Sequence, residues 1–158
     1  CGAALASLYQ QVLAASVLLF FYHAVFTPIS IDEPVGMLGM FLLSWLSGVG
    51  IGMVLMSIRP WQPELASIVT TILMRINMIA SGKMLLVNNT PPRIRAMFDW
   101  NPLFHTIDQS RGFIFLNYGP RYTSIDYPVM VALACVMIGL MMEFFTRQHV
   151  SASWNKRR

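Results

Sequence analysis

Charged side chains are scarce in this sequence of 158 residues. Asp, Glu, Lys and Arg together make up 11% of it, against about 25% in a typical soluble domain. None of the four occurs between residues 1 and 31 or between residues 35 and 58, whereas 56% of all residues are hydrophobic. Apolar runs longer than about 18 residues are typical of membrane-spanning helices. The composition therefore excludes an ordinary soluble domain and predicts an all-α integral membrane protein.

Cysteine is also rare, with two residues in all. Cys135 lies within an apolar run, where we expect a small buried hydrophobic side chain. Cys1 and Gly2 resemble the beginning of a mature bacterial lipoprotein, but the apolar run that follows at once favours a piece of a longer protein. Neither cysteine has the spacing that predicts a disulfide framework or a metal site.

The hydrophobic runs predict four transmembrane helices, separated by proline-containing or acidic segments. Each run holds about 18 to 24 residues, which at about 1.5 Å per residue covers a hydrocarbon core about 30 Å thick. Pro63 and Glu64 fit the first turn of the third helix, because proline suits that turn and an acid suits the helix N-terminus. The predicted spans are about 5–26, 35–58, 64–86 and 128–145.

The distribution of charge predicts the orientation of these spans. Lys156, Arg157 and Arg158 close the chain, whereas the first loop carries Asp32 and Glu33 without any Lys or Arg. Basic residues beside a span favour the cytoplasmic side. We therefore expect both ends of the chain in the cytoplasm and residues 88–126 outside it. The net charge of +4 then reflects membrane orientation, and no nucleic-acid partner is expected.

Small residues recur every four positions in the second predicted span. Ser44, Gly48 and Gly52 share one helix face, where the backbone of another helix can approach closely. The nearby glycines lack the GxGxxG spacing of a phosphate-binding loop. This face therefore predicts helix packing.

Arg75 interrupts the third predicted span. It lies about eleven residues after the start, so about 16 Å along the helix axis and near the middle of the bilayer. A charge at this depth costs several kcal/mol unless it meets water, protein or a counter-charge. Asn77 and Ser81 extend a polar stripe beside it, and Lys83 is close enough to the end to reach the interface. Two interpretations stay open: a functional site, or a structural pair with backbone or with a residue outside this chain.

Residues 88–126 are too long and too amphipathic for a simple loop. Asn101 is a good helix N-cap, and Pro102 suits the first helical position. A helix from that point has an apolar side formed by Leu103, Phe104 and Ile107. We expect this helix to lie in the membrane interface or against the bundle, with its other side facing water.

The opposite side of that helix carries His105 and Asp108. Asp108 and Arg111 can form an ion pair at i, i+3. A histidine beside an acid is also a general-base arrangement. However, no recognisable nucleophile motif and no His-Glu-x-x-His motif accompanies it. A polar pair on a helix surface is therefore favoured over catalysis.

These elements resemble the membrane subunit of bacterial ABC-2 type exporters, and most of all the permeases that export capsular or O-antigen polysaccharide. The resemblance rests on "FLLSWLSGVGIGMVLMSIRPWQPELASIVTTILMRINMIASG", on "WNPLFHTIDQSR" and on a last span that ends in a basic tail. It covers nearly the whole chain but only the last four of the family's usual six spans. Drug and teichoic acid exporters share these features, so the substrate stays open. The residues that match the family pattern are Asn101, Pro102, Leu103, Asp108, Arg111 and the mid-span Arg75.

The resemblance implies a homodimer in the bacterial inner membrane that works with separate ATPase subunits. Those subunits would bind ATP and Mg²⁺, since this sequence has no phosphate-binding loop. It also implies that residues 88–126 form short re-entrant or interfacial gate helices on the periplasmic side, with Asn101, Pro102, His105, Asp108 and Arg111 on the gate helix.

A lipid-linked polysaccharide is the substrate that the resemblance implies, and membrane lipid surrounds the subunit. Sugar rings stack on aromatic faces, so aromatic and polar residues are candidates for the translocation path. Core or interfacial packing is the alternative for each aromatic residue. A non-transporting scaffold and a membrane enzyme are the competing functions. The path candidates are Trp45, Arg75, Asn77, Ser81, Tyr118 and Tyr122.

Overall fold

The computed structural model describes residues 2–25, 33–81, 86–115 and 117–155, with side chains up to residue 148. Helices and short turns account for these residues, without any strand, so the all-α prediction is confirmed. Asp32, Lys83 and the basic tail at 156–158 lie outside the described residues. The helices are α1 (Gly2–Val25), α2 (Pro34–Ile58), α3 (Pro63–Ala80), the 3-10 helix η1 (Val87–Asn89), α4 (Pro92–Phe98), α5 (Pro102–Ile114) and α6 (Asp126–Asn155).

Four helices in the described part are long and apolar enough to cross a membrane. They are α1, α2, α3 and the Asp126–Gln148 part of α6. The prediction of four transmembrane helices is therefore confirmed. The third helix ends at Ala80, whereas the sequence predicts a span to about residue 86, and residues 82–85 lie outside the described part. Large apolar side chains along these helices are exposed in the isolated chain, as expected for surfaces that face lipid or other helices.

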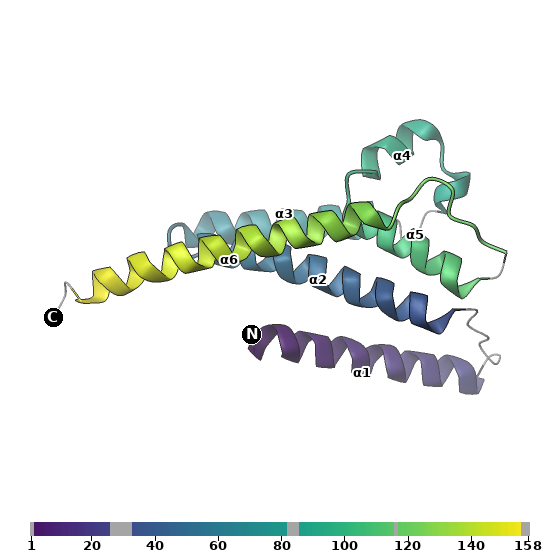
Figure 1. Cartoon of the computed structure of the whole chain (residues 1–158), viewed down its shortest axis with the longest axis horizontal. Coiled ribbons are helices and arrows are strands. Elements are labelled where there is room, and N and C mark those ends of the chain that lie inside the picture. The colour runs from purple at the N-terminus through teal and green to yellow at the C-terminus, as the bar shows by residue number, and fades with distance from the viewer. Residues whose placement is uncertain (1, 26–32, 82–85, 116, 156–158) are drawn as a thin grey trace.

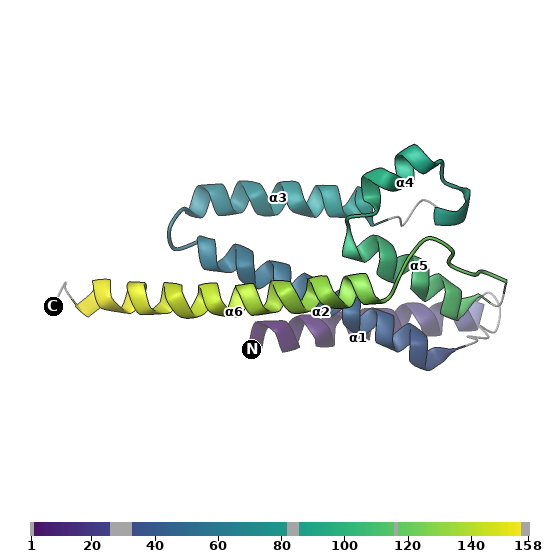
Figure 2. The same ribbon diagram turned by 45° about the horizontal axis from the view of Figure 1, so that its top comes forward.

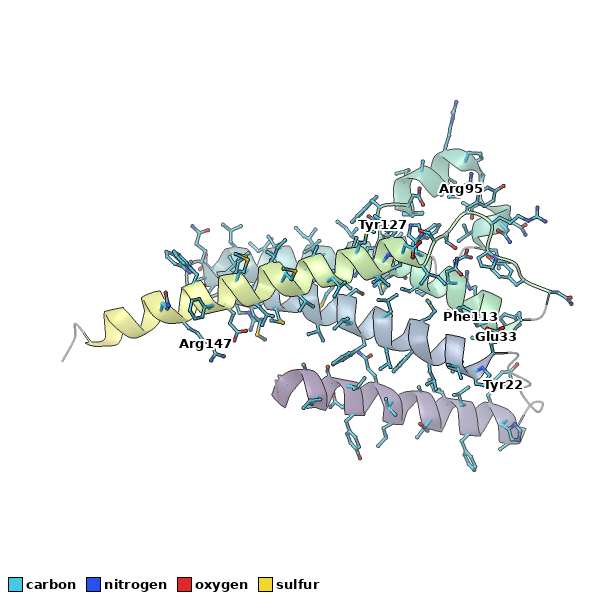
Figure 3. All side chains as sticks on the ribbon, viewed as in Figure 1. Tyr22, Glu33, Arg95, Phe113, Tyr127 and Arg147 are labelled. Carbon is cyan, nitrogen blue, oxygen red and sulfur yellow. The ribbon has the colours of Figure 1, made fainter. Side chains whose placement is uncertain are left out.

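The long helices run roughly parallel or antiparallel to one another, and the short helices gather at one end (Figures 1 and 2). That end holds the beginnings of α2 and α6 and the end of α3. α5 lies along the first part of α2 there, and α4 projects beyond it. The backbone N–H of Glu33 donates to the carbonyl of Phe113 at 3.0 Å, and Figure 3 shows these two residues where α5 ends beside α2. Residues 86–126 therefore form a cap at one end of the bundle.

Two glycines allow α2 and α6 to pack closely. A Cβ added to Gly50 would lie 2.9 Å from the Cβ of Cys135 and 3.1 Å from the backbone nitrogen of Val136. A Cβ added to Gly139 would lie 2.8 Å from the Cβ of Met53. The hydroxyl of Thr146 also donates to the backbone carbonyl of α2 at residue 57, at 3.3 Å. The backbones of the two helices are thus in direct contact.

The face of α2 that the sequence predicts to pack, with Ser44, Gly48 and Gly52, is not the face that contacts α6. A Cβ added to Gly48 or Gly52 would meet nothing within 4 Å in this chain, and Ser44 is half-buried. Gly50 lies two positions from each glycine, so it points to another side of the helix. The close contact within this chain uses Gly50, and packing by the face of Ser44, Gly48 and Gly52 stays a prediction for helices beyond it.

Gly50 and Gly39, both on α2, form a matched pair for testing this packing. We expect Gly50→Ala to lower the free energy of unfolding by about 1 to 3 kcal/mol, because the added methyl group meets backbone that cannot move aside. Gly39→Ala should leave the unfolding midpoint of the detergent-solubilised full-length protein almost unchanged, because a Cβ added to Gly39 would meet nothing within 4 Å. Equal midpoints for the two variants would show that Gly50 does not set the distance between α2 and α6.

Candidate functional site

The cap is held to the bundle through the first turn of α5. Asn101 is the N-cap of this helix, as predicted, and its side-chain oxygen accepts a hydrogen bond from the backbone N–H of Leu103 at 3.0 Å. The side-chain amide of Asn101 donates to the side-chain oxygen of Asn77, on α3, at 2.7 Å. Asn101 is only 1% exposed. The structure thus joins a candidate path residue on a membrane helix to a candidate gate residue.

The predicted water-facing side of α5 is buried. His105 is 5% exposed and Asp108 is 0% exposed, so the expectation that they face water is wrong. The physical reason is tertiary: the connection from α5 to α6 folds back over this side and supplies hydrogen-bond partners for it. Phe104 on the predicted apolar side is also buried. The helix is therefore enclosed on both sides.

Asp108 forms the centre of this buried polar cluster. The hydroxyl of Tyr118 donates to one carboxylate oxygen, and the hydroxyl of Thr123 donates to the other at 2.9 Å. The side-chain amide of Gln109 donates to the backbone carbonyl of Thr123 at 2.8 Å. A buried carboxylate is tolerated only when such donors replace water. The ion pair expected between Asp108 and Arg111 stays a prediction.

The proton on Tyr118 is held firmly. Burial, followed by the hydrogen bond to Asp108, raises the pKa of Tyr118 from its ordinary value of 10.0 to about 12. Ionising this phenol would remove the donor and place a second negative charge beside the carboxylate. Tyr118 therefore acts as a neutral hydrogen-bond donor across the physiological pH range.

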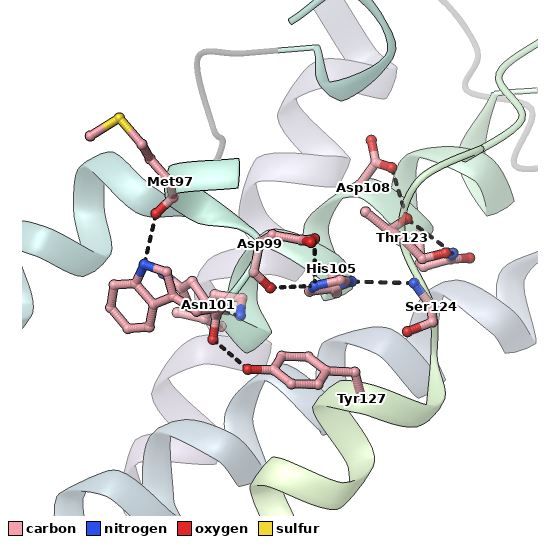
Figure 4. A network of polar contacts seen from close by, with 11 residues as sticks. Met97, Asp99, Asn101, His105, Asp108, Thr123, Ser124 and Tyr127 are labelled. Atoms are coloured by element: carbon pink, nitrogen blue, oxygen red, sulfur yellow. Dashed lines mark hydrogen bonds and ion pairs between the residues drawn. The ribbon is translucent and has the colours of Figure 1, made fainter. Parts of the chain in front are cut away.

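His105 has separate partners for its two ring nitrogens (Figure 4). Its Nε2 lies 2.8 Å from the backbone carbonyl oxygen of Asp99, and its Nδ1 accepts from the backbone N–H of Ser124 at 3.2 Å. The neutral tautomer with a proton on Nε2 satisfies both contacts. His105 and Asp108 each bind other groups, so they form neither the predicted surface pair nor a general-base pair. The two ring nitrogens of His105 thus bind backbone groups of the segments on either side of the ring, at Asp99 and Ser124.

An open pocket of about 440 Å³ lies beside His105. Trp100 is 56% exposed and Tyr122 is 50% exposed. The guanidinium carbon of Arg95 lies 3.6 Å from the centre of the Tyr122 ring. The sequence reasoning missed Trp100 and Tyr127, although aromatic residues that flank a capped polar helix are a signal that could have identified them. The pocket is lined by Asp99, Trp100, His105, Tyr122, Ser124 and Tyr127.

The six candidate path residues do not gather on one surface of this chain. Trp45 lies between α1 and α2, where its indole N–H donates to the hydroxyl of Ser7 at 3.2 Å. Ser81 is buried and donates to the carbonyl of Met78 in its own helix, at 3.2 Å. Arg75 is exposed on α3. Asn77 forms a hydrogen bond to the cap, and Tyr118 and Tyr122 belong to it.

Comparison with known proteins gives two relatives. Both are described as polysialic acid transport protein KpsM of Escherichia coli, and they are 27% and 26% identical to this chain over 105 residues. The chain is similar to polysaccharide transport permeases. This confirms the resemblance found in the sequence. The match covers 64% of this chain but 40% of each relative, so the chain spans less than half of their length. No family model matches the chain.

The raised pKa of Tyr118 leads to a pH-dependent prediction. Because the pKa is higher in the folded state, the neutral phenol contributes stability that is complete below about pH 10 and is lost as the pH rises through about 12. At pH 8, Tyr118→Phe should lower the free energy of unfolding by about 1 to 3 kcal/mol, since Asp108 loses a donor. The gap between wild type and variant should narrow above pH 10. A gap that stays constant from pH 8 to pH 11, or an equal loss in Tyr9→Phe, would contradict this role.

The position of Arg75 allows its two interpretations, a functional site and a structural pair, to be tested. Among the residues that the structure describes, nothing forms a hydrogen bond or ion pair with its guanidinium. We therefore expect Arg75→Leu to leave the amount of protein in the membrane near normal while reducing transport, because the charge serves water, substrate or another chain. Arg75→Lys tests whether the planar guanidinium is needed in addition to its charge. Loss of the protein itself would indicate a structural pair, and normal transport by Arg75→Leu would exclude both roles.

Proposed function

We propose that this chain is part of the membrane-spanning subunit of an ATP-driven exporter that moves a lipid-linked polysaccharide across the bacterial inner membrane. The observation that carries this proposal is the similarity to polysialic acid transport proteins over 105 residues. Four apolar helices with a hydrogen-bonded polar cap at one end are consistent with it. The cap would then lie on the periplasmic side and both ends of the chain in the cytoplasm, as the charge distribution favours.

The energy for transport would come from another subunit. The sequence carries no phosphate-binding loop, so ATP and Mg²⁺ would be bound by a partner ATPase. A second copy of the permease would complete the path. In this chain, open space lies beside Gly48 and Gly52, where a further helix can approach the backbone closely.

The cap would act as the gate of this path. Hydrogen bonds join it to the bundle through Asn101 to α3 and through the backbone of Phe113 to the start of α2, and α5 also packs along α2. Its internal contacts converge on Asp108 and His105. Because α5 packs along α2, opening of the gate would either move α2 with it or break this packing.

Deletion of the gene that encodes this permease should test the proposal. We expect surface polysaccharide to disappear, polymer to accumulate inside the cell, and a plasmid copy to reverse both effects. The purified full-length permease should hydrolyse ATP only together with its ATPase partner, and a partner with its phosphate-loop lysine replaced should abolish turnover. Normal surface polysaccharide in the deletion strain, or ATP turnover that belongs to the permease alone, would overturn the proposal.

A further inference from the structure

Hydrogen bonds fix Trp100 in place, but its aromatic surface is exposed. Its indole N–H donates to the backbone carbonyl of Met97 at 2.7 Å, and its own carbonyl accepts from the hydroxyl of Tyr127 at 2.7 Å. Trp100 is nevertheless 56% exposed. Its polar atom is therefore satisfied by the protein, while much of its apolar surface is left uncovered. Little conformational entropy remains to be lost when another molecule stacks on such a ring.

Tyr122 adds a second aromatic wall to the same pocket. It is 50% exposed, and the guanidinium of Arg95 over its ring favours one orientation. Tyr122 comes from the connection before α6, whereas Trp100 comes from the turn between α4 and α5. The two rings are brought to one pocket only by the fold of the cap.

The polar groups that line the pocket are suited to accepting hydrogen bonds from a ligand and not to binding an anion. The side chain of Asp99 is 58% exposed, and Ser124 is exposed beside it. Both nitrogens of His105 already have backbone partners, and its Nε2 also lies 3.4 Å from a carboxylate oxygen of Asp99. None of the six lining residues, all of them in the described part of the chain, is Lys or Arg. An anionic group in the pocket would meet the carboxylate of Asp99, whereas the hydroxyls of a neutral ligand could donate to this carboxylate. Arg95, a cation close by, lies over the Tyr122 ring and outside the lining.

This combination fits a neutral sugar better than a membrane surface or an acidic sugar. A pyranose ring offers an apolar C–H face for stacking and hydroxyls for a carboxylate. The volume of about 440 Å³ falls within the range of about 300 to 1,000 Å³ that small-molecule sites occupy. Phosphate headgroups and sialic acid carboxylates would both be repelled by Asp99.

We propose that the pocket formed by Asp99, Trp100, His105, Tyr122, Ser124 and Tyr127 binds one neutral hexose unit of the exported glycan. The inference rests on the proposed function and extends it to the class of sugar. Trp100 and Tyr122 stack on the sugar, and the carboxylate of Asp99 accepts its hydroxyl protons in hydrogen bonds. The site holds the glycan where it meets the cap.

Binding can be measured on the full-length permease in phosphatidylcholine nanodiscs. The probes are maltotriose, mannotriose and galactotriose, with a sialic acid trimer as the acidic comparison. We expect at least one neutral trisaccharide to bind, and Trp100→Ala and Asp99→Asn each to weaken this binding about tenfold or more, as for residues at the centre of a site. Trp61→Ala is the matched control, because Trp61 is 59% exposed and does not line the pocket. Its affinity should equal that of the wild type.

Three results would overturn the inference. They are binding of the sialic acid trimer alone, no binding of any trisaccharide, and equal affinities in wild type, Trp100→Ala and Asp99→Asn. Brominated lipids in the nanodisc give an independent measurement on a variant of the full-length permease that keeps Trp100 and has phenylalanine at every other tryptophan. Strong quenching of its fluorescence would assign Trp100 to the membrane interface and so exclude the sugar site, whereas weak quenching supports it.

Export in cells separates this inference from the proposed function. If the deletion strain exports polysaccharide normally, the proposed function fails. If export needs the permease but Trp100→Ala and Asp99→Asn export and bind sugar as the wild type does, only the sugar site fails. The amount of each variant in the membrane should match the wild type, because both residues are exposed and neither supplies a side chain to the cluster around Asp108. Asp99→Asn also keeps the backbone carbonyl that lies 2.8 Å from Nε2 of His105.

Discussion

The burial of one carboxylate, that of Asp108, organises the polar end of this protein. A buried carboxylate without hydrogen-bond donors costs several kcal/mol, and donors to Asp108 come from Tyr118 and Thr123. Both lie on the connection between α5 and α6, so this connection must fold back along α5. The backbone of Ser124 is then placed against His105, and Tyr122 is brought to the pocket beside Trp100. The pocket therefore forms because the connection that supplies hydrogen-bond donors to Asp108 also brings Tyr122 and Ser124 beside Trp100.

A second polar contact ties this arrangement to the membrane helices. The amide of Asn101 donates to the side chain of Asn77 on α3, where an unpaired polar group near lipid would be costly. The same Asn101 side chain caps α5 with its oxygen. A displacement of α3 relative to the bundle must therefore either move the first turn of α5 or break this bond. In a transporter, such a contact joins the position of a membrane helix to the position of the cap.

The two ends of the bundle differ in what holds them together. Away from the cap, α2 and α6 are joined by close backbone packing at Gly50 and Gly139 and by the hydroxyl of Thr146. At the cap, side-chain hydrogen bonds hold the connection after α5, and α5 packs closely against α2, where a Cβ added to Gly36 would lie 2.6 Å from the ring of Phe113. Glycine packing depends on tight contact over many atoms, whereas individual hydrogen bonds can exchange partners. Under the proposed export function, this contrast favours movement in the connection between α5 and α6 and rigidity where α2 packs against α5 and α6.

Local chemistry in the sequence determined the membrane helices and the start of α5. Long runs without charge can only be helices in a bilayer, and an asparagine followed by proline caps a helix wherever the chain goes next. The tertiary structure decided which faces are covered. Periodicity places His105 and Asp108 on one side of α5, but it carries no information about the connection that returns over that side. Likewise, Gly48 and Gly50 are equally small, and only the position of α6 makes Gly50 the contact. Burial is a property of pairs of segments, so it follows from the fold and not from either segment alone.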